Sequence, residues 1–145
     1  MNDFLNSYSR YLEAVAKANA LNKPLVFDAL AAAGLTLVEV EFDGEGDSGQ
    51  IEGVYAYAGD TRTELPSSSL TLHQAAQNKA DLKTTTVSIS DAIATLCYDY
   101  LSQTHGGWEN NDGAYGTFAF DVRERTIRLD FNERFSDSTL HTHDF

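Results

Sequence analysis

The sequence has little cysteine, little proline and few basic residues, and each shortage excludes a class of protein. A single cysteine, Cys97, can form neither an internal disulfide nor a cysteine-based zinc site, which fits a reducing compartment. Two prolines and ten glycines exclude collagen-like and low-complexity chains. No apolar run reaches the roughly 18 residues that a membrane-spanning helix needs, and the N-terminus lacks the pattern of a signal peptide. We therefore expect a cytoplasmic protein that makes no contact with a membrane.

The shortage of positive charge is the strongest of these signals. Lys and Arg together number 10 against 22 Asp and Glu, which gives a formal net charge of −12. Such a chain repels phosphate backbones, so we expect no direct binding to nucleic acid and, where charge selects the partner, a basic partner. The 42% of apolar residues over 145 positions suffices for one core, and no linker divides the chain. These features predict a single domain over residues 1–145.

Apolar residues at three- and four-residue spacing predict helices in two parts of the chain. Two helices are expected near the N-terminus: one over Phe4–Asn19, and a second with Pro24 in its first turn and Gly34 as its C-terminal stop. A third helix is expected after Ser88, which is suited to cap it, and this helix ends by His105.

Apolar residues at two-residue spacing predict strands in two other parts. Val38–Phe42 and Ile51–Ala58 form a first antiparallel hairpin around the glycine-rich loop Asp43–Gln50. Two further strands, around Phe118–Val122 and Ile127–Phe131, form a second hairpin with a short turn between them.

Residues 59–87 do not follow one period, and their structure stays open, with Leu72–Leu82 as a candidate short helix. The remaining elements predict the fold class. We expect an α+β domain with a mainly antiparallel sheet of about four strands, built from two hairpins, and helices packed on one face.

Acidic residues gather around the first predicted hairpin. Between Lys23 and Arg62 the chain has no basic residue. Glu39 and Glu41 should project from the same side of their strand about 7 Å apart, which is within the Debye length of about 8 Å, so the two carboxylates repel each other. Solubility is the common explanation for such a charged surface. The alternative is a surface that competes for the basic groove of a nucleic-acid-binding protein.

A glycine-rich loop after the third predicted helix contains the only tryptophan, Trp108. Trp108 either forms an aromatic platform for a partner or folds back onto the core, and both alternatives stay open. This loop and the acidic hairpin together form the predicted partner-binding set. Its members are Glu39, Glu41, Asp43, Glu45, Asp47, Glu52, Trp108, Glu109 and Asp112.

No set of residues forms a recognisable catalytic motif, so we predict neither an enzyme nor a cofactor. The carboxylates that alternate after Asp43 resemble a calcium loop, but Ser48 and Val54 stand where an EF-hand requires glycine and glutamate. Cys97 shares the apolar stripe of its helix, which indicates a core position. The alternative hypothesis is a metal-dependent hydrolase or a metal-regulated module, and a third is a structural subunit with a large apolar patch. The candidate metal ligands are Asp43, Glu45, Asp47, Glu109, Asp112 and His143.

Several segments resemble an uncharacterised family of small acidic proteins encoded by proteobacterial plasmids, phages and other mobile elements. The segments are FDGEGDSGQIE (42–52), HGGWENNDGAYGTFAFDV (105–122), TIRLDFNER (126–134) and the terminal HTHDF (141–145), and the resemblance covers roughly the last 110 residues. The resemblance implies a context, because proteins from such elements often bind and block host defence systems, including CRISPR effectors. The resulting hypothesis is a non-enzymatic acidic module that inhibits or regulates a nucleic-acid-binding complex by occluding its basic surface.

Overall fold

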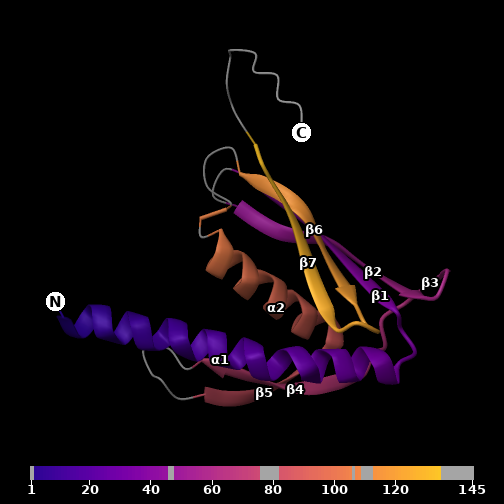
Figure 1. The fold of residues 1–145 in the computed structure, drawn as a ribbon, viewed down its shortest axis with the longest axis horizontal. Coiled ribbons are helices and arrows are strands. Elements are labelled where there is room, and N and C mark those ends of the chain that lie inside the picture. The colour runs from indigo at the N-terminus through magenta and orange to yellow at the C-terminus, as the bar shows by residue number, and fades with distance from the viewer. Residues whose placement is uncertain (1, 46–47, 76–81, 106, 109–112, 135–145) are drawn as a thin grey trace, which may run out of the picture.

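The computed structural model describes residues 2–45, 48–75, 82–105, 107–108 and 113–134. These residues form two helices and seven strands (Figure 1). In chain order the elements are α1 (Asn2–Ala32), β1 (Leu37–Glu45), β2 (Ser48–Ala58), β3 (Thr61–Thr63), β4 (Ser69–Ala75), β5 (Leu82–Ser88), α2 (Ile89–Thr104), β6 (Ala114–Asp121) and β7 (Thr126–Glu133).

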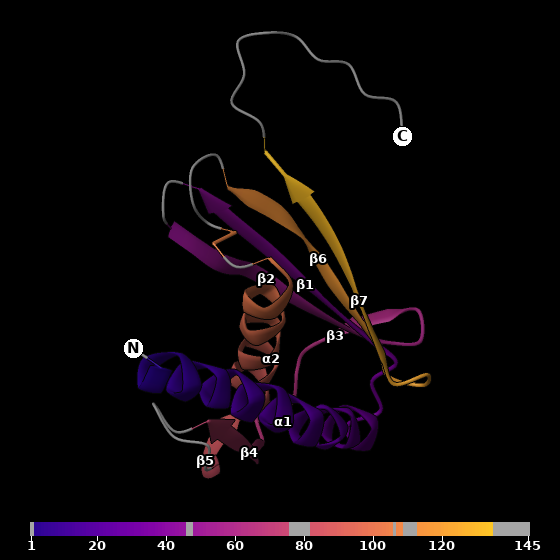
Figure 2. The same ribbon diagram turned by 60° about the vertical axis from the view of Figure 1, so that its left-hand side comes forward.

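The strands form two antiparallel sheets, with the helices between them. Five strands make the larger sheet in the order β3-β2-β1-β6-β7, so β1 is its central strand, and β4 and β5 pair as a separate hairpin. Helix α2 lies beside one face of the larger sheet, α1 crosses below it, and the β4-β5 hairpin lies on the far side of α1 (Figures 1 and 2). The predicted α+β class is confirmed, but seven strands in two sheets replace the expected four. Among the described residues, no helix is long and apolar enough to cross a membrane.

The larger sheet follows the two-residue period of its sequence. Val38, Val40 and Phe42 of β1 are buried, and the residues between them face the other way. Both predicted hairpins are present, β1 with β2 and β6 with β7, and β1 and β6 pair directly, so the two hairpins join edge to edge. The core fills the space between this sheet and the helices. Its largest fully buried side chains include Phe27, Leu30, Phe42, Leu72, Ile93, Leu96, Leu101, Phe118 and Phe120.

The expected pair of N-terminal helices is wrong, because α1 is one helix that continues through Pro24. Pro24 has no N–H to donate to the carbonyl of Ala20. Both residues are exposed, so water can hydrogen-bond to that carbonyl. Asn22 and Val26, on either side of the proline, are both buried. Packing against the domain body therefore holds the two halves in one helix and offsets the lost hydrogen bond.

The candidate helix over Leu72–Leu82 is also wrong, because this region contributes to two strands, with residues 76–81 outside the described part. A contact from far along the chain supports the strand at His73. The side chain of Asn22 donates a hydrogen bond to the His73 carbonyl at 2.8 Å and accepts one from the His73 N–H at 2.7 Å. The amide of Asn22 thus takes the place of a neighbouring strand along the edge of β4, and local sequence gives no sign of this partner.

Helix α2 begins and ends where the sequence predicts. The Ser88 side chain accepts a hydrogen bond from the Asp91 N–H at 3.0 Å and caps the first turn. The helix ends at Thr104, and the N–H of His105 donates to the carbonyl of Leu101. The buried side of α2 includes Cys97, so its predicted core position is confirmed.

Candidate functional site

One face of the five-stranded sheet has no helix from the described residues over it, and we call it the outer face (Figure 2). Residues paired across neighbouring strands point to the same side of a sheet, so the register of β1 with β2 and β6 assigns this face. It combines carboxylates on β1 with tyrosines on both neighbouring strands. Its main residues are Glu39, Glu41, Asp43 and Glu45 of β1, Tyr55 and Tyr57 of β2, Tyr115 and Thr117 of β6, and Arg128 and Asp130 of β7.

The four carboxylates of β1 lie in a row along the centre of the outer face. Neighbouring members are about 7 Å apart, twice the rise per strand residue. Within the described part of the chain, Glu39, Glu41 and Glu45 form no ion pair. The predicted placement of Glu39 and Glu41 on one side of a strand is confirmed.

Asp43 differs from the other three carboxylates because Arg134 binds it. The guanidinium Nη2 of Arg134 lies 2.8 Å from Asp43 Oδ2, and Nη1 donates to the carbonyls of Gly44 and Ala114 at 3.1 and 3.3 Å. The guanidinium also lies over the ring of Tyr115, 4.8 Å from its centre. The hydrogen bond to Asp43 raises the pKa of Arg134 above its already high value. Asp43 therefore helps to join the ends of three strands, and its charge is largely compensated.

A second arginine lies on a tyrosine of the same face. The guanidinium of Arg62, on β3, is 4.6 Å from the centre of the Tyr55 ring. The Tyr55 ring lies along β2 over Gly53, where an added Cβ would be 2.6 Å from the tyrosine hydroxyl. Gly53 is opposite Glu41 in the register, so glycine lets the ring lie flat beside the carboxylate row. Neither arginine is predicted from the sequence, because Arg134 lies about 90 residues from Asp43 and Arg62 lies across a turn from β2.

Trp108 does not lie on the outer face. Its ring packs edge-on against Phe42, with ring centres 5.4 Å apart at 87°, and Phe42 is buried on the helix side of the sheet. Of the two alternatives left open by the sequence, the return of Trp108 to the core is the one the structure supports. The predicted partner-binding set is therefore divided between the two sides of the sheet.

The remaining members of the predicted set are only partly described. Glu52 is the extra residue of the bulge between Ile51 and Gly53, and its carboxylate accepts a hydrogen bond from Gln50 at 3.0 Å. The acidic residues Asp47, Glu109 and Asp112 lie outside the described residues.

The structure brings together no metal centre within the part of the chain that it describes. No group of three or more His, Cys, Asp or Glu side chains is suited to hold an ion there. Of the candidate ligands, only Asp43 and Glu45 are described, and Asp43 is bound by Arg134. His143 lies beyond the last described residue. Burial raises the pKa of the Cys97 thiol, which disfavours the thiolate that a ligand or nucleophile requires.

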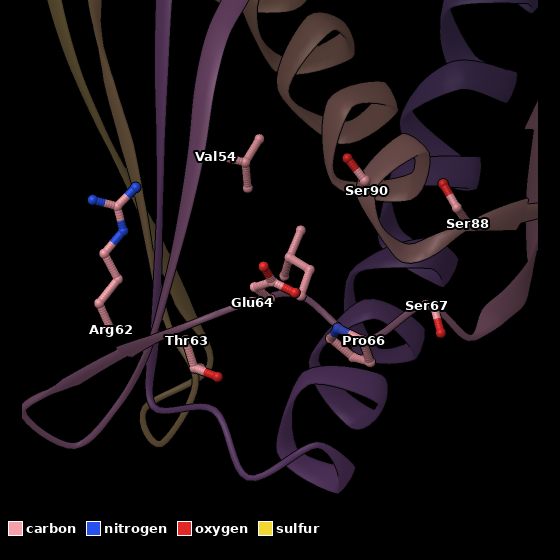
Figure 3. Close-up of a pocket in the computed structure, with 9 residues that line it drawn as sticks. Val54, Arg62, Thr63, Glu64, Pro66, Ser67, Ser88 and Ser90 are labelled. Atoms are coloured by element: carbon pink, nitrogen blue, oxygen red, sulfur yellow. The ribbon is translucent and has the colours of Figure 1, made fainter.

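A cleft of about 690 Å³ opens at the edge of β2, between the β3-β4 connection and the start of α2 (Figure 3). Val54 projects toward α2, whereas Arg62 lies on the other side of β2. Hydroxyl groups line much of the cleft and Glu64 adds a negative charge, whereas the guanidinium of Arg62 lies over Tyr55 on the outer face. Its described lining is Val54, Arg62, Thr63, Glu64, Leu65, Pro66, Ser67, Ser88 and Ser90. The free carboxylates of β1 take no part in it.

Comparison with known proteins identifies one family. A family of unknown function (DUF6878) matches residues 18–145, which agrees with the resemblance to an uncharacterised family. The match begins within α1, at a residue that is buried against the domain body. No curated protein and no solved structure matches the chain.

Proposed function

We infer that this chain, which belongs to the DUF6878 family, is a non-enzymatic acidic protein-binding module. In this proposal it acts in the cytoplasm and inhibits or regulates a nucleic-acid-binding complex by covering the basic surface of that complex. One observation carries the proposal: the central strand of the uncovered sheet face bears three carboxylates that form no ion pair within the described residues. Glu39 and Glu41 repel each other at about 7 Å, Glu45 lies about twice as far along the strand from Glu41, and a basic partner would relieve the repulsion.

The outer face is large enough to form the centre of an interface. Its four longer strands, at about 4.8 Å spacing, span about 14 Å, and a nine-residue strand such as β1 is about 30 Å long. The resulting area, on the order of 400 Å², is about half of the roughly 800 Å² that each partner buries in a stable complex. A surface of this size can block a nucleic-acid groove both by its bulk and by its charge. Complementary charge would also speed the encounter with a basic groove.

The class of complex that we propose rests on the family resemblance and not on the geometry of the outer face. The resemblance to proteins of plasmids and phages makes host-defence effectors, including CRISPR-type complexes, the first class to test. The net charge of −12 supports a basic partner and disfavours direct binding of this chain to nucleic acid.

The test compares two triple variants of the full chain in pull-downs from bacterial lysate at low and high salt. The first carries Glu39→Gln, Glu41→Gln and Glu45→Gln on the outer face. The matched control carries Glu13→Gln, Asp60→Asn and Glu124→Gln, which remove the same charge from exposed positions on α1 and in two turns.

We expect the unmodified chain and the control to recover a nucleic-acid-binding protein at low salt, and added DNA or RNA to compete for it. The outer-face variant should recover several-fold less. Equal recovery by both variants, or no nucleic-acid-binding protein at either salt, would overturn the proposal. Circular dichroism spectra of both variants confirm that each is folded.

A further inference from the structure

We propose that the outer face selects arginine over lysine, so that its partner is an extended, arginine-rich protein segment. This inference rests on the proposed function and names the chemistry of the partner at the same surface. Charge alone does not distinguish the two basic residues, whereas aromatic rings beside carboxylates do, because a guanidinium stacks on a ring and a hydrated ammonium does so less well.

The molecule already binds two guanidiniums on this face. Arg134 lies 4.8 Å from the Tyr115 ring centre and 2.8 Å from an Asp43 oxygen, and Arg62 lies 4.6 Å from the Tyr55 ring centre. The chain has ten basic residues, and the two that lie over rings in the described part are both arginines on this one face. The outer face is therefore shaped to receive planar cations on its tyrosines.

A third tyrosine of the outer face, Tyr57, is the cross-strand partner of Arg62, whose guanidinium lies over Tyr55 instead. Tyr57 is only partly buried, and no cation of the described residues lies on its ring. Its partner across β1 is Leu37, and Glu39 is the next residue of β1 on the same side. Such diagonal neighbours have Cβ atoms about 7 Å apart, a gap that one guanidinium can bridge. Glu41 continues the same row without an ion partner in the described part.

The spacing of these carboxylates indicates an extended partner. Glu39 and Glu41 are separated by two strand residues, about 7 Å, and alternate side chains of an extended peptide have the same separation. A segment with arginine at every second position can therefore place one guanidinium beside each carboxylate. The three unpaired glutamates of β1 supply the charge complementarity that holds such a segment.

The test uses two fluorescein-labelled peptides of equal length and charge. One has four arginines at alternate positions separated by glycine and serine, and the other has lysines at the same positions. Fluorescence anisotropy measures the affinity of each peptide for the full chain at about physiological salt. We expect the arginine peptide to bind about tenfold more tightly, which corresponds to about 1.4 kcal/mol.

Two variants test separately what the Tyr57 ring and the Glu39 and Glu41 carboxylates contribute to peptide binding. Tyr57→Leu keeps an apolar side chain on β2 and should bring the arginine peptide to within about twofold of the lysine peptide, with little change for lysine. The combined Glu39→Gln and Glu41→Gln change should weaken both peptides, whereas Glu13→Gln with Glu124→Gln should weaken neither. Thermal melts verify that every variant is folded.

The outcomes distinguish this inference from the proposed function. If both peptides bind equally and both lose affinity in the glutamate variant, selection of arginine is overturned and the acidic binding face stands. If neither peptide binds, the proposed function fails together with the inference. If Tyr57→Leu leaves the tenfold preference intact, the assignment to Tyr57 is wrong.

Discussion

Two buried asparagines, three residues apart on α1, should respond very differently to the same substitution. Asn22 is 1% exposed and exchanges two hydrogen bonds with the backbone of His73. Asn22→Ala removes both bonds and leaves an N–H and a C=O of β4 without partners. Each net hydrogen bond contributes about 1 kcal/mol, and an unpaired buried backbone group costs about 1 to 3 kcal/mol, so we expect a loss of about 3 kcal/mol.

Asn19 is the matched control for this experiment. It is 4% exposed, and within the described residues neither its Oδ1 nor its Nδ2 has a hydrogen-bond partner. Asn19→Ala removes a buried amide whose polar atoms have lost contact with water without gaining hydrogen bonds, which favours the folded state. The small cavity that the substitution leaves disfavours it by a similar amount. We therefore expect the free energy of unfolding to change by less than about 1 kcal/mol.

Urea denaturation and thermal melts, both followed by circular dichroism, measure the two asparagine variants. In a 145-residue chain, 1 kcal/mol corresponds to about 3 °C in melting temperature, so Asn22→Ala should melt about 9 °C lower and Asn19→Ala within about 3 °C of the unmodified protein. Equal losses of stability in the two variants would refute this reasoning. The cost of replacing each asparagine would then depend on its burial alone and not on hydrogen bonds to β4.

Three further predictions concern single positions. Burial raises the pKa of Asp99 to about 6, so its carboxyl ionises more easily in the unfolded chain, and stability falls as the pH rises from about 4 to about 6. Asp99→Asn should therefore stabilise the fold by about 1 kcal/mol at about pH 7.5, after allowance for solvent screening, and not at about pH 3.5, as urea titrations at both pH values would show. Gly113→Ala should destabilise by more than about 3 kcal/mol in urea titrations, because its φ is +77° and an added Cβ would collide with the Gly44 carbonyl. Gly59→Ala, at φ +62° in open space, should cost only about 1 kcal/mol. The Cys97 thiol should react with a disulfide reagent only at the rate of unfolding; fast labelling of the folded chain would contradict its burial.

The sequence predicts best where a local pattern and the tertiary contacts agree. The strands around Val38–Phe42 and Phe118–Val122 alternate cleanly because one side of each packs on the helices and the other faces outward. The start of α2 is also predictable, because Ser88 caps it through a contact within one turn. For the same reason, the placement of Glu39 and Glu41 on one side of a strand follows from their spacing alone.

The elements that the sequence does not predict depend on contacts between distant residues. The helix continues through Pro24 because both flanks are buried against the domain body, and β4 lies beside Asn22, about 50 residues away. The same holds for the candidate site. Asp43 is joined to Arg134 from the end of the second hairpin, about 90 residues later, so its charge looks free in the sequence and is compensated in the fold.

The join between the two hairpins of the larger sheet has a consequence for folding during synthesis. Val40 pairs with Phe118, so about 80 residues must be made after β1 before its second edge can be covered. At about 5 to 20 residues per second, β1 waits roughly 4 to 16 s with that edge open. An open strand edge readily pairs with other chains, and charged side chains along it discourage this. The carboxylates of β1 would thus protect the nascent chain from aggregation, a role separate from the proposed binding of a partner.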